Sequence, residues 1–229
     1  MTRATGAATA ACAVYAACAA GLLAWPLAAT ALPMGSLGTW MLMGDANAGS
    51  RDLSANYAIT PRDALGGGLA RWDDGGRLRE TAGLNYTRLV RRWNLPHAQA
   101  NLWFVGQAGA ARLAGGEGAG AAAARAPFAS LAVLADYETT RVYLGGGLRP
   151  LRGGDGLRWD TAWARAGFSF YEAEYDEVQP WFVLEAKRER GAFERKSLAT
   201  PMLRLIHRRF FVELGGNRDG GVFNFMFNY

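Results

Sequence analysis

Cysteine is scarce in this chain of 229 residues. Its two cysteines, Cys12 and Cys18, both lie within the first 31 residues. If that segment is removed after export, the remaining chain has no cysteine. This absence excludes disulfides, thiolate metal sites and cysteine nucleophiles together.

Long apolar runs are missing beyond the N-terminus. Apolar residues make up 50% of the chain, but its mean hydropathy is −0.05. No later run reaches the roughly 20 apolar residues that a transmembrane helix needs. We therefore do not expect a helical membrane protein. A closed β-barrel remains possible, because it crosses a membrane with strands.

The N-terminus has the features of an export signal. Arg3 supplies a positive charge, an apolar run follows, and a small-x-small cleavage site ends at Ala31. These features predict a signal peptide over residues 1–31 and a mature chain over residues 32–229. A retained single helix and lipoprotein processing at Cys18 are the alternatives.

Lysine is nearly absent too, since Lys187 and Lys196 are the only two. Removing the first 31 residues takes away one arginine and no acid, so 24 basic and 20 acidic residues leave a net charge of +4. The basic residues are scattered, and no aromatic-basic motif of a nucleic-acid module is present. We expect no nucleic-acid partner.

Apolar and polar residues alternate along most of the chain. Over residues 51–60, Leu53, Ala55, Tyr57 and Ile59 fall on one face and polar residues on the other, which is typical of a half-buried strand. Similar segments separated by turns predict an all-β fold of twelve strands, with ten as the alternative count. The expected strands cover residues 38–45, 51–60, 64–72, 78–89, 98–110, 127–138, 142–149, 158–171, 178–188, 198–206, 210–215 and 221–229.

The last strand, residues 221–229, has one wholly aromatic face, formed by Phe223, Phe225, Phe227 and Tyr229. Its other face is mostly polar. The segment resembles the C-terminal strand of Gram-negative outer-membrane β-barrels, which ends on an aromatic residue. The resemblance implies an antiparallel up-and-down transmembrane barrel in the cell outer membrane. It also implies that this strand is the signal that the barrel-assembly machinery recognises.

The alternate faces indicate which side of the wall meets lipid. One set is Ala, Leu, Val, Phe and Tyr on nearly every strand, and the other set carries charges. In a soluble barrel or sandwich, the alternative fold, these charges would face water. In a membrane barrel they face the lumen, and the candidates are Asp52, Arg79, Asp136, Glu138, Arg149, Arg165, Glu185, Lys187, Arg204 and Glu213.

Signals for catalysis are weak. His97 and His207 are the only histidines, both are expected in turns, and neither belongs to a motif that places it beside a serine. The glycine triplets at 66–68 and 145–147 lack the following helix and lysine of a phosphate loop. They are better explained as bends in a barrel wall. We expect no enzyme activity and no cofactor.

One methionine group allows a metal hypothesis. Closure of the barrel would pair the first and last strands and bring Met41, Met43 and Met226 together on the inner face. Thioethers favour Cu(I), so a soft-metal site is a hypothesis. Methionine as a flexible filler of the core is the simpler explanation.

The expected function is that of an integral outer-membrane barrel, embedded in outer-membrane lipid and of undetermined oligomeric state. Paired lumen charges would give a solid, non-conducting barrel, and segregated charges would give a narrow passive channel for small polar solutes. The alternative is a structural or interaction barrel that works through its outer loops. Those loops are expected outside the cell near Ala46, Asp73, Arg112, Pro150, Glu189 and Gly216, with the longest at 112–126.

Overall fold

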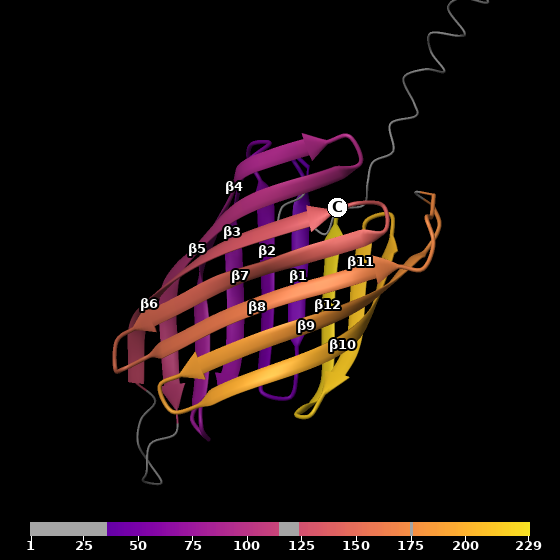
Figure 1. Ribbon diagram of the computed structural model, residues 1–229. Coiled ribbons are helices and arrows are strands. Elements are labelled where there is room, and N and C mark those ends of the chain that lie inside the picture. The colour runs from indigo at the N-terminus through magenta and orange to yellow at the C-terminus, as the bar shows by residue number, and fades with distance from the viewer. Residues whose placement is uncertain (1–35, 115–123, 175) are drawn as a thin grey trace, which may run out of the picture.

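The computed structural model describes residues 36–114, 124–174 and 176–229 (Figure 1). The predicted signal peptide, with Cys12 and Cys18, lies outside the described residues. Among the described residues, no helix has the length and hydropathy needed to cross a membrane. The twelve strands are β1 (Trp40–Ala46), β2 (Ser50–Ala58), β3 (Asp63–Asp73), β4 (Leu78–Leu95), β5 (Ala98–Ala114), β6 (Ala124–Glu138), β7 (Val142–Gly153), β8 (Arg158–Ser169), β9 (Gln179–Gly191), β10 (Arg195–His207), β11 (Phe210–Asn217) and β12 (Gly220–Asn228).

The strands form one closed barrel in which each pairs antiparallel with its neighbours in sequence. Closure joins β1 to β12, so that Met43 lies directly opposite Met226. The backbones of Trp40 and Tyr229 exchange two hydrogen bonds of 2.9 and 3.0 Å at the edge of this seam. The predicted fold and strand number are confirmed. We call the end where β1 begins and β12 finishes the terminal end, and the other the far end.

The outer surface of the wall is apolar and the inner surface is polar. Leu84, Leu148 and Leu69 point outward with 78%, 61% and 60% of their surfaces exposed. By contrast, Glu213 and Arg204 lie inside with 0% and 1% exposed. A barrel in water would have the opposite polarity, whereas a barrel in lipid pairs its backbone internally and turns its apolar side chains outward. The barrel therefore spans a bilayer.

The aromatic face of β12 lies on the outer surface, as its alternation predicted. The Phe227 ring stacks on Phe210 of β11 at a centroid distance of 4.5 Å and on Tyr229 at 5.5 Å. Asn224 and Met226 point inward and are buried. These aromatic rings form a patch of the outer surface at the terminal end, where an interfacial girdle is expected.

The strands run further than the sequence pattern predicted. The expected strand over residues 78–89 continues to Leu95, past a register shift between Leu89 and Arg91, and β5 pairs with it down to Ala98. This extension replaces the turn expected at residues 91–97 with a tight hairpin. The backbone ladder can continue because the basic side chains of the extension are exposed at the terminal end.

The charged segment 189–196 was predicted to be a loop, and this was wrong. Glu189 pairs with Lys196 and Arg190 pairs with Arg195, so β9 and β10 continue through most of it. Strand β7 likewise includes Pro150 and reaches Gly153. Charged residues fit in these strand ends because backbone pairing does not depend on side-chain polarity once the strand has left the apolar belt.

The described connections do not show the predicted asymmetry of long outer loops and short inner turns. At the far end they cover only residues 47–49, 74–77, 154–157, 192–194 and 218–219. The longest described connection, 170–178, is at the terminal end. The two ends of the expected longest loop at 112–126 belong to β5 and β6, and its centre, 115–123, lies outside the described residues.

Candidate functional site: the barrel interior

The terminal end of the bore is filled by apolar side chains. Trp103, Trp181, Met41 and Val183 all point inward and have at most 1% of their surfaces exposed. They belong to one contiguous buried cluster, which we call the apolar floor. Its members are Met41, Ala58, Ala64, Leu89, Trp103, Tyr143, Trp181, Val183, Met202, Ile206, Phe211 and Met226.

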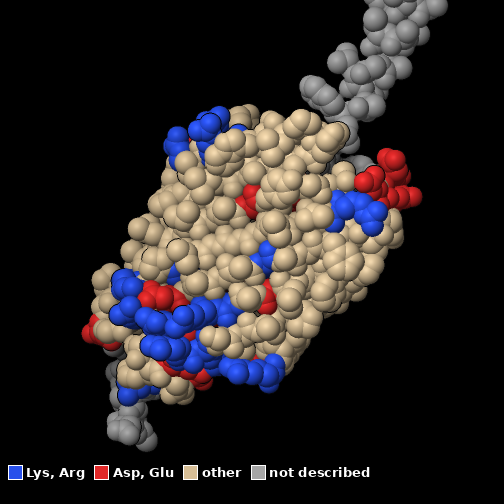
Figure 2. Space-filling view, viewed as in Figure 1, with Lys and Arg blue, Asp and Glu red and all other residues tan. Residues whose placement is uncertain are grey.

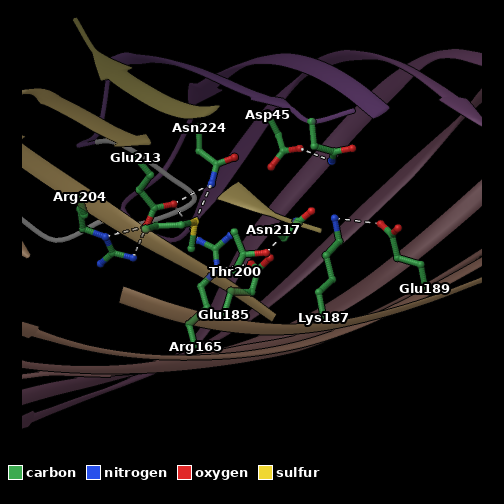
Figure 3. A network of polar contacts seen from close by, with 12 residues as sticks. Asp45, Arg165, Glu185, Lys187, Glu189, Thr200, Arg204, Glu213, Asn217 and Asn224 are labelled. Carbon is green, nitrogen blue, oxygen red and sulfur yellow. Dashed lines mark hydrogen bonds and ion pairs between the residues drawn. The ribbon is translucent and has the colours of Figure 1, made fainter. Parts of the chain in front are cut away.

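A network of charged side chains lies next to the apolar floor (Figure 3). Arg204 donates to Glu213 Oε1 from Nε at 2.9 Å and from Nη2 at 2.8 Å. Glu213 Oε2 accepts from Arg165 Nη1 at 3.2 Å and from Asn224 Nδ2 at 2.8 Å. Arg165 Nε donates to Glu185 Oε2 at 2.6 Å. Four charges of alternating sign thus join strands β8, β9, β10 and β11 across the bore.

The guanidinium of Arg204 is also held between two aromatic rings. Its central carbon lies 4.2 Å from the Tyr143 ring centroid and 4.8 Å from that of Phe211. A cation over an aromatic face is attracted by the ring quadrupole, more strongly where water is excluded. Arg204 therefore has a fixed position at the boundary between the apolar floor and the network.

A second polar group lies on β5 and β6. Asp136 accepts hydrogen bonds from Asn101 Nδ2 at 2.6 Å and from Trp103 Nε1 at 2.8 Å. Arg92 Nε donates to Asn101 Oδ1 at 2.8 Å. The indole of the apolar floor is thereby anchored by a carboxylate, which satisfies its buried N–H.

Beyond the network, the bore widens into a cavity of about 350 Å³, which we call the chamber. Asp45, Asp52, Arg149 and Lys187 line it, and Tyr143 and Trp103 of the apolar floor close its bottom. Lys187 pairs with Glu189 Oε1 at 2.9 Å. Within the described part of the chain, Asp52 and Arg149 form no ion pair within 4.0 Å. The chamber thus presents both signs of charge to whatever enters it.

The chamber adjoins a second, smaller hollow at the far end of the barrel. That hollow shares Lys187 and Glu189 with the chamber and reaches Asn47 and Asp219 in the far-end connections. Lys196 stands at this mouth, 2.9 Å from Glu194 and 3.7 Å from Asp219. The interior is therefore apolar at the terminal end, whereas the far end carries both these polar groups and a second buried apolar cluster. The members of that cluster are Trp72, Ala111, Leu113, Ala126, Phe128, Leu151 and Leu157.

No protein-family model and no curated protein sequence matches this chain. Several solved structures share the fold at low similarity. The KdgM porin in complex with disordered oligogalacturonate is 11% identical, with a TM-score of 0.47 over 83% of this chain and 98% of that one. LpxR from Salmonella typhimurium is 8% identical, with a TM-score of 0.46 over 83% and 99%. The translocator domain of autotransporter NalP from Neisseria meningitidis is 13% identical, with a TM-score of 0.45 over 97% and 98%. These values carry no information on solute or activity.

The structure brings together some of the lumen candidates and separates others. Arg165, Arg204, Glu185 and Glu213 form the charged network, and Asp136 binds Asn101 and Trp103 instead of an arginine. The remaining candidates fall into two groups. One group lines the chamber and consists of Asp52, Arg149 and Lys187. The other group lies outside the chamber. Arg79 is 3.8 Å from Asp74 beneath the far-end connections, and Glu138 is the last residue of β6, at the terminal end.

The three methionines of the metal hypothesis do meet at the β1–β12 seam. Met41 and Met226 are part of the apolar floor, and Met43 packs against it. The nearby Met202 sulfur lies 3.9 Å from Asn224 Nδ2. Their surroundings are those of core methionines, and copper binding stays a prediction.

Both histidines were predicted in turns, and the structure confirms this for His97 only. His97 is in the β4–β5 turn, and His207 ends β10. Among the described hydrogen bonds, neither joins a serine. The absence of enzyme activity stays a prediction.

Sequence reasoning did not identify the inward aromatic residues as site residues. In the alternation of their strands, three tryptophans fall on the same face as the charged residues: Trp103, Trp163 and Trp181. This alternation was the signal in the sequence that could have placed them inside the barrel. The glycines of β7 are part of the same arrangement, because a Cβ on Gly145 would meet the Tyr143 ring and one on Gly147 would meet the Trp163 ring. Both triplets lie inside strands, and the triplet of β7 makes room for aromatic rings. In the triplet of β3, a Cβ on Gly66 would meet the backbone of Ala55, and one on Gly68 would meet the amide of Asn85.

Proposed function

We propose that this protein is an outer-membrane barrel that does not conduct ions and that offers a charged chamber to small polar solutes from outside the cell. The observation that supports the proposal most directly is the apolar floor. A constriction lined by buried tryptophan, methionine and valine excludes water, and a dewetted constriction blocks ions. The predicted export signal and the apolar outer belt support the placement in the outer membrane, with the far end outside.

The charged network supports the same proposal. A passive pore requires polar groups that are free to exchange partners with a passing solute. In this barrel the arginines and glutamates next to the apolar floor are bonded to one another, and Glu213 has no exposed surface. The network thus narrows the bore further, while the apolar floor is the layer that excludes water and blocks ions.

The chamber gives the proposal its second part. Its volume of about 350 Å³ is at the lower limit for small-molecule sites. Asp52 and Arg149 offer an acid and a base without a described ion-pair partner, so the chamber fits solutes that carry both charges or several hydroxyl groups.

Conductance in planar bilayers tests the proposal. We expect the purified wild-type barrel to insert without producing current steps. The double variant Trp103→Ala/Trp181→Ala, which removes two large side chains of the apolar floor, should conduct. A matched variant, Trp40→Ala, changes a tryptophan of the outer surface and should stay silent. Regular current steps from the wild-type protein would contradict the proposal and favour the narrow channel.

A further inference from the structure

The outer surface of the far end carries pairs of arginines that face each other across neighbouring strands. Arg51 of β2 lies directly opposite Arg71 of β3, and both project outward. Like charges directly opposite each other destabilise a sheet. Three more such pairs occur, and all four lie at the far end of the described strands: Arg112 with Arg125, Arg152 with Arg158, and Arg190 with Arg195.

These pairs lie just beyond the apolar belt of the wall. Figure 2 shows Lys and Arg gathered, with some Asp and Glu among them, at the lower end of the barrel over the β7–β8 and β9–β10 hairpins, below a broad surface with few charged atoms. Part of this charge is compensated, because Asp160 pairs with both Arg152 and Arg158. We call the set of outward arginines in the four facing pairs the arginine band.

The band is continuous on strands β2 to β6. The strand registers place Arg51, Arg71, Glu80, Arg112 and Arg125 in one cross-strand row. Glu80 lies 3.8 Å from Arg71 and 3.3 Å from Arg112, so one acid serves two arginines. The side chains of these two arginines are 63% and 58% exposed. Four positive charges and one negative charge leave this row with a net charge of +3.

A recess in the outer wall lies beside the same row. Its volume is about 540 Å³, and Leu53, Leu69, Ala82 and Ala110 line its apolar part. Leu53 and Leu69 face each other across β2 and β3, and the two alanines continue this row on β4 and β5, where their short side chains leave space. Leu69 is 60% exposed. An acyl chain fits such a recess, which continues from the apolar belt up to the arginines.

We propose that this row and its recess bind a lipid of the surrounding leaflet whose headgroup carries phosphate. The phosphate would be bound by Arg51, Arg71, Arg112 and Arg125, because the guanidinium group presents paired N–H donors that match phosphate oxygens. An acyl chain of the same molecule would occupy the recess. The facing arginines, unfavourable by themselves, are stabilised when an anion lies between them.

The position of the band favours a lipid over a soluble polyanion. A nucleic acid or an acidic protein would use the charge but would leave an apolar recess uncovered. A lipid headgroup at the membrane surface supplies negative charge at the height of the band and a chain at the height of the recess. Like the proposed function, this inference rests on the barrel's position across a bilayer. It does not depend on whether the lumen conducts ions.

Binding of lipid A to the purified full-length barrel in a neutral detergent tests the inference by native mass spectrometry. We expect the wild-type protein to retain diphosphorylated lipid A. The variant Arg51→Gln/Arg125→Gln should bind roughly tenfold or more weakly, since each arginine near an anionic surface contributes about a fivefold change in affinity. This variant leaves both ion pairs of Glu80 in place, so the fold of the row is preserved.

Two controls keep the result specific. The variant Arg62→Gln/Arg209→Gln removes the same charge from turns at the terminal end and should bind like wild type. Dephosphorylated lipid A should bind at least tenfold more weakly than the diphosphorylated form. Equal binding by the two double variants, equal binding of the two lipids, or complete competition by an equal concentration of inorganic phosphate would overturn the inference. Current steps in bilayers would contradict the proposed function alone and leave this inference standing.

Discussion

Arg204 and Glu213 lie directly opposite each other on β10 and β11, and their side chains are 1% and 0% exposed. They are the most deeply buried ion pair of the described barrel. Glu213 also accepts from Arg165 and Asn224, so one carboxylate serves three donor residues. We therefore expect the stability of the barrel interior to depend on the Glu213 carboxylate.

Replacing Glu213 with leucine should lower the free energy of unfolding by about 3 kcal/mol, because the buried Arg204 loses its carboxylate partner and Arg165 loses one of two. Urea unfolding in lipid vesicles measures the change. The variant Glu194→Leu, which removes an acid paired with Lys196 at the open mouth, should cost about 1 kcal/mol or less. Adding Arg204→Met to Glu213→Leu should recover part of the loss. Equal losses for Glu213→Leu and Glu194→Leu would contradict the network's role.

The outer belt gives a second prediction. Leu84 is 78% exposed near the middle of β4, where its side chain faces lipid. Leu84→Arg should therefore cost about 2–4 kcal/mol in vesicles, the range for arginine at the bilayer midplane. Ser197→Arg, at an outward position near the far end of β10, should cost about 1 kcal/mol or less. A similar cost for the two variants would show that the belt does not lie in the bilayer.

Closure of the barrel can be tested at the β1–β12 seam. Leu42 faces Phe227 across the seam, so the variant Leu42→Cys/Phe227→Cys should form a disulfide on mild oxidation. The offset pair Leu42→Cys/Phe225→Cys should not, since Phe225 lies opposite Gly44. Gel mobility before and after reduction reports the bond. Cross-linking of the offset pair in preference to the facing pair would mean a different register.

The absence of cysteine from residues 32–229 allows the interior to be mapped with single cysteines. In intact cells, Asp52→Cys in the chamber should react with a small charged methanethiosulfonate reagent added from outside. Val183→Cys in the apolar floor should not react, because Val183 has no exposed surface. Labelling of both positions would show that the bore is open to water along its length.

The sequence predicted which face of each strand turns inward, because a strand's alternation depends only on its own residues. Leu53 and Leu84 face outward, and Asn224 and Met226 face inward, for this local reason. The pairing of Arg204 with Glu213 could also have been predicted, since the tight turn at Arg208 and Arg209 fixes the register of β10 and β11.

Other features depend on how strands far apart in the sequence meet inside the barrel. The contact between Arg165 of β8 and Glu213 of β11 crosses the bore, and no local pattern determines it. Arg165 pairs with Glu185 in a register that the long connection 170–178 leaves free. Strand ends were missed for another reason: the charged residues around Arg190 resemble a loop in composition but continue the backbone ladder.

The apolar floor has a consequence for the cell that makes this protein. Each open pore in an envelope adds a path for small molecules, antibiotics among them. Under the proposed function, a barrel sealed by its own tryptophans adds no such path, so its copy number can rise without weakening the permeability barrier. Overproduction of the wild-type protein should leave drug susceptibility unchanged, whereas overproduction of Trp103→Ala/Trp181→Ala should make the cells leaky.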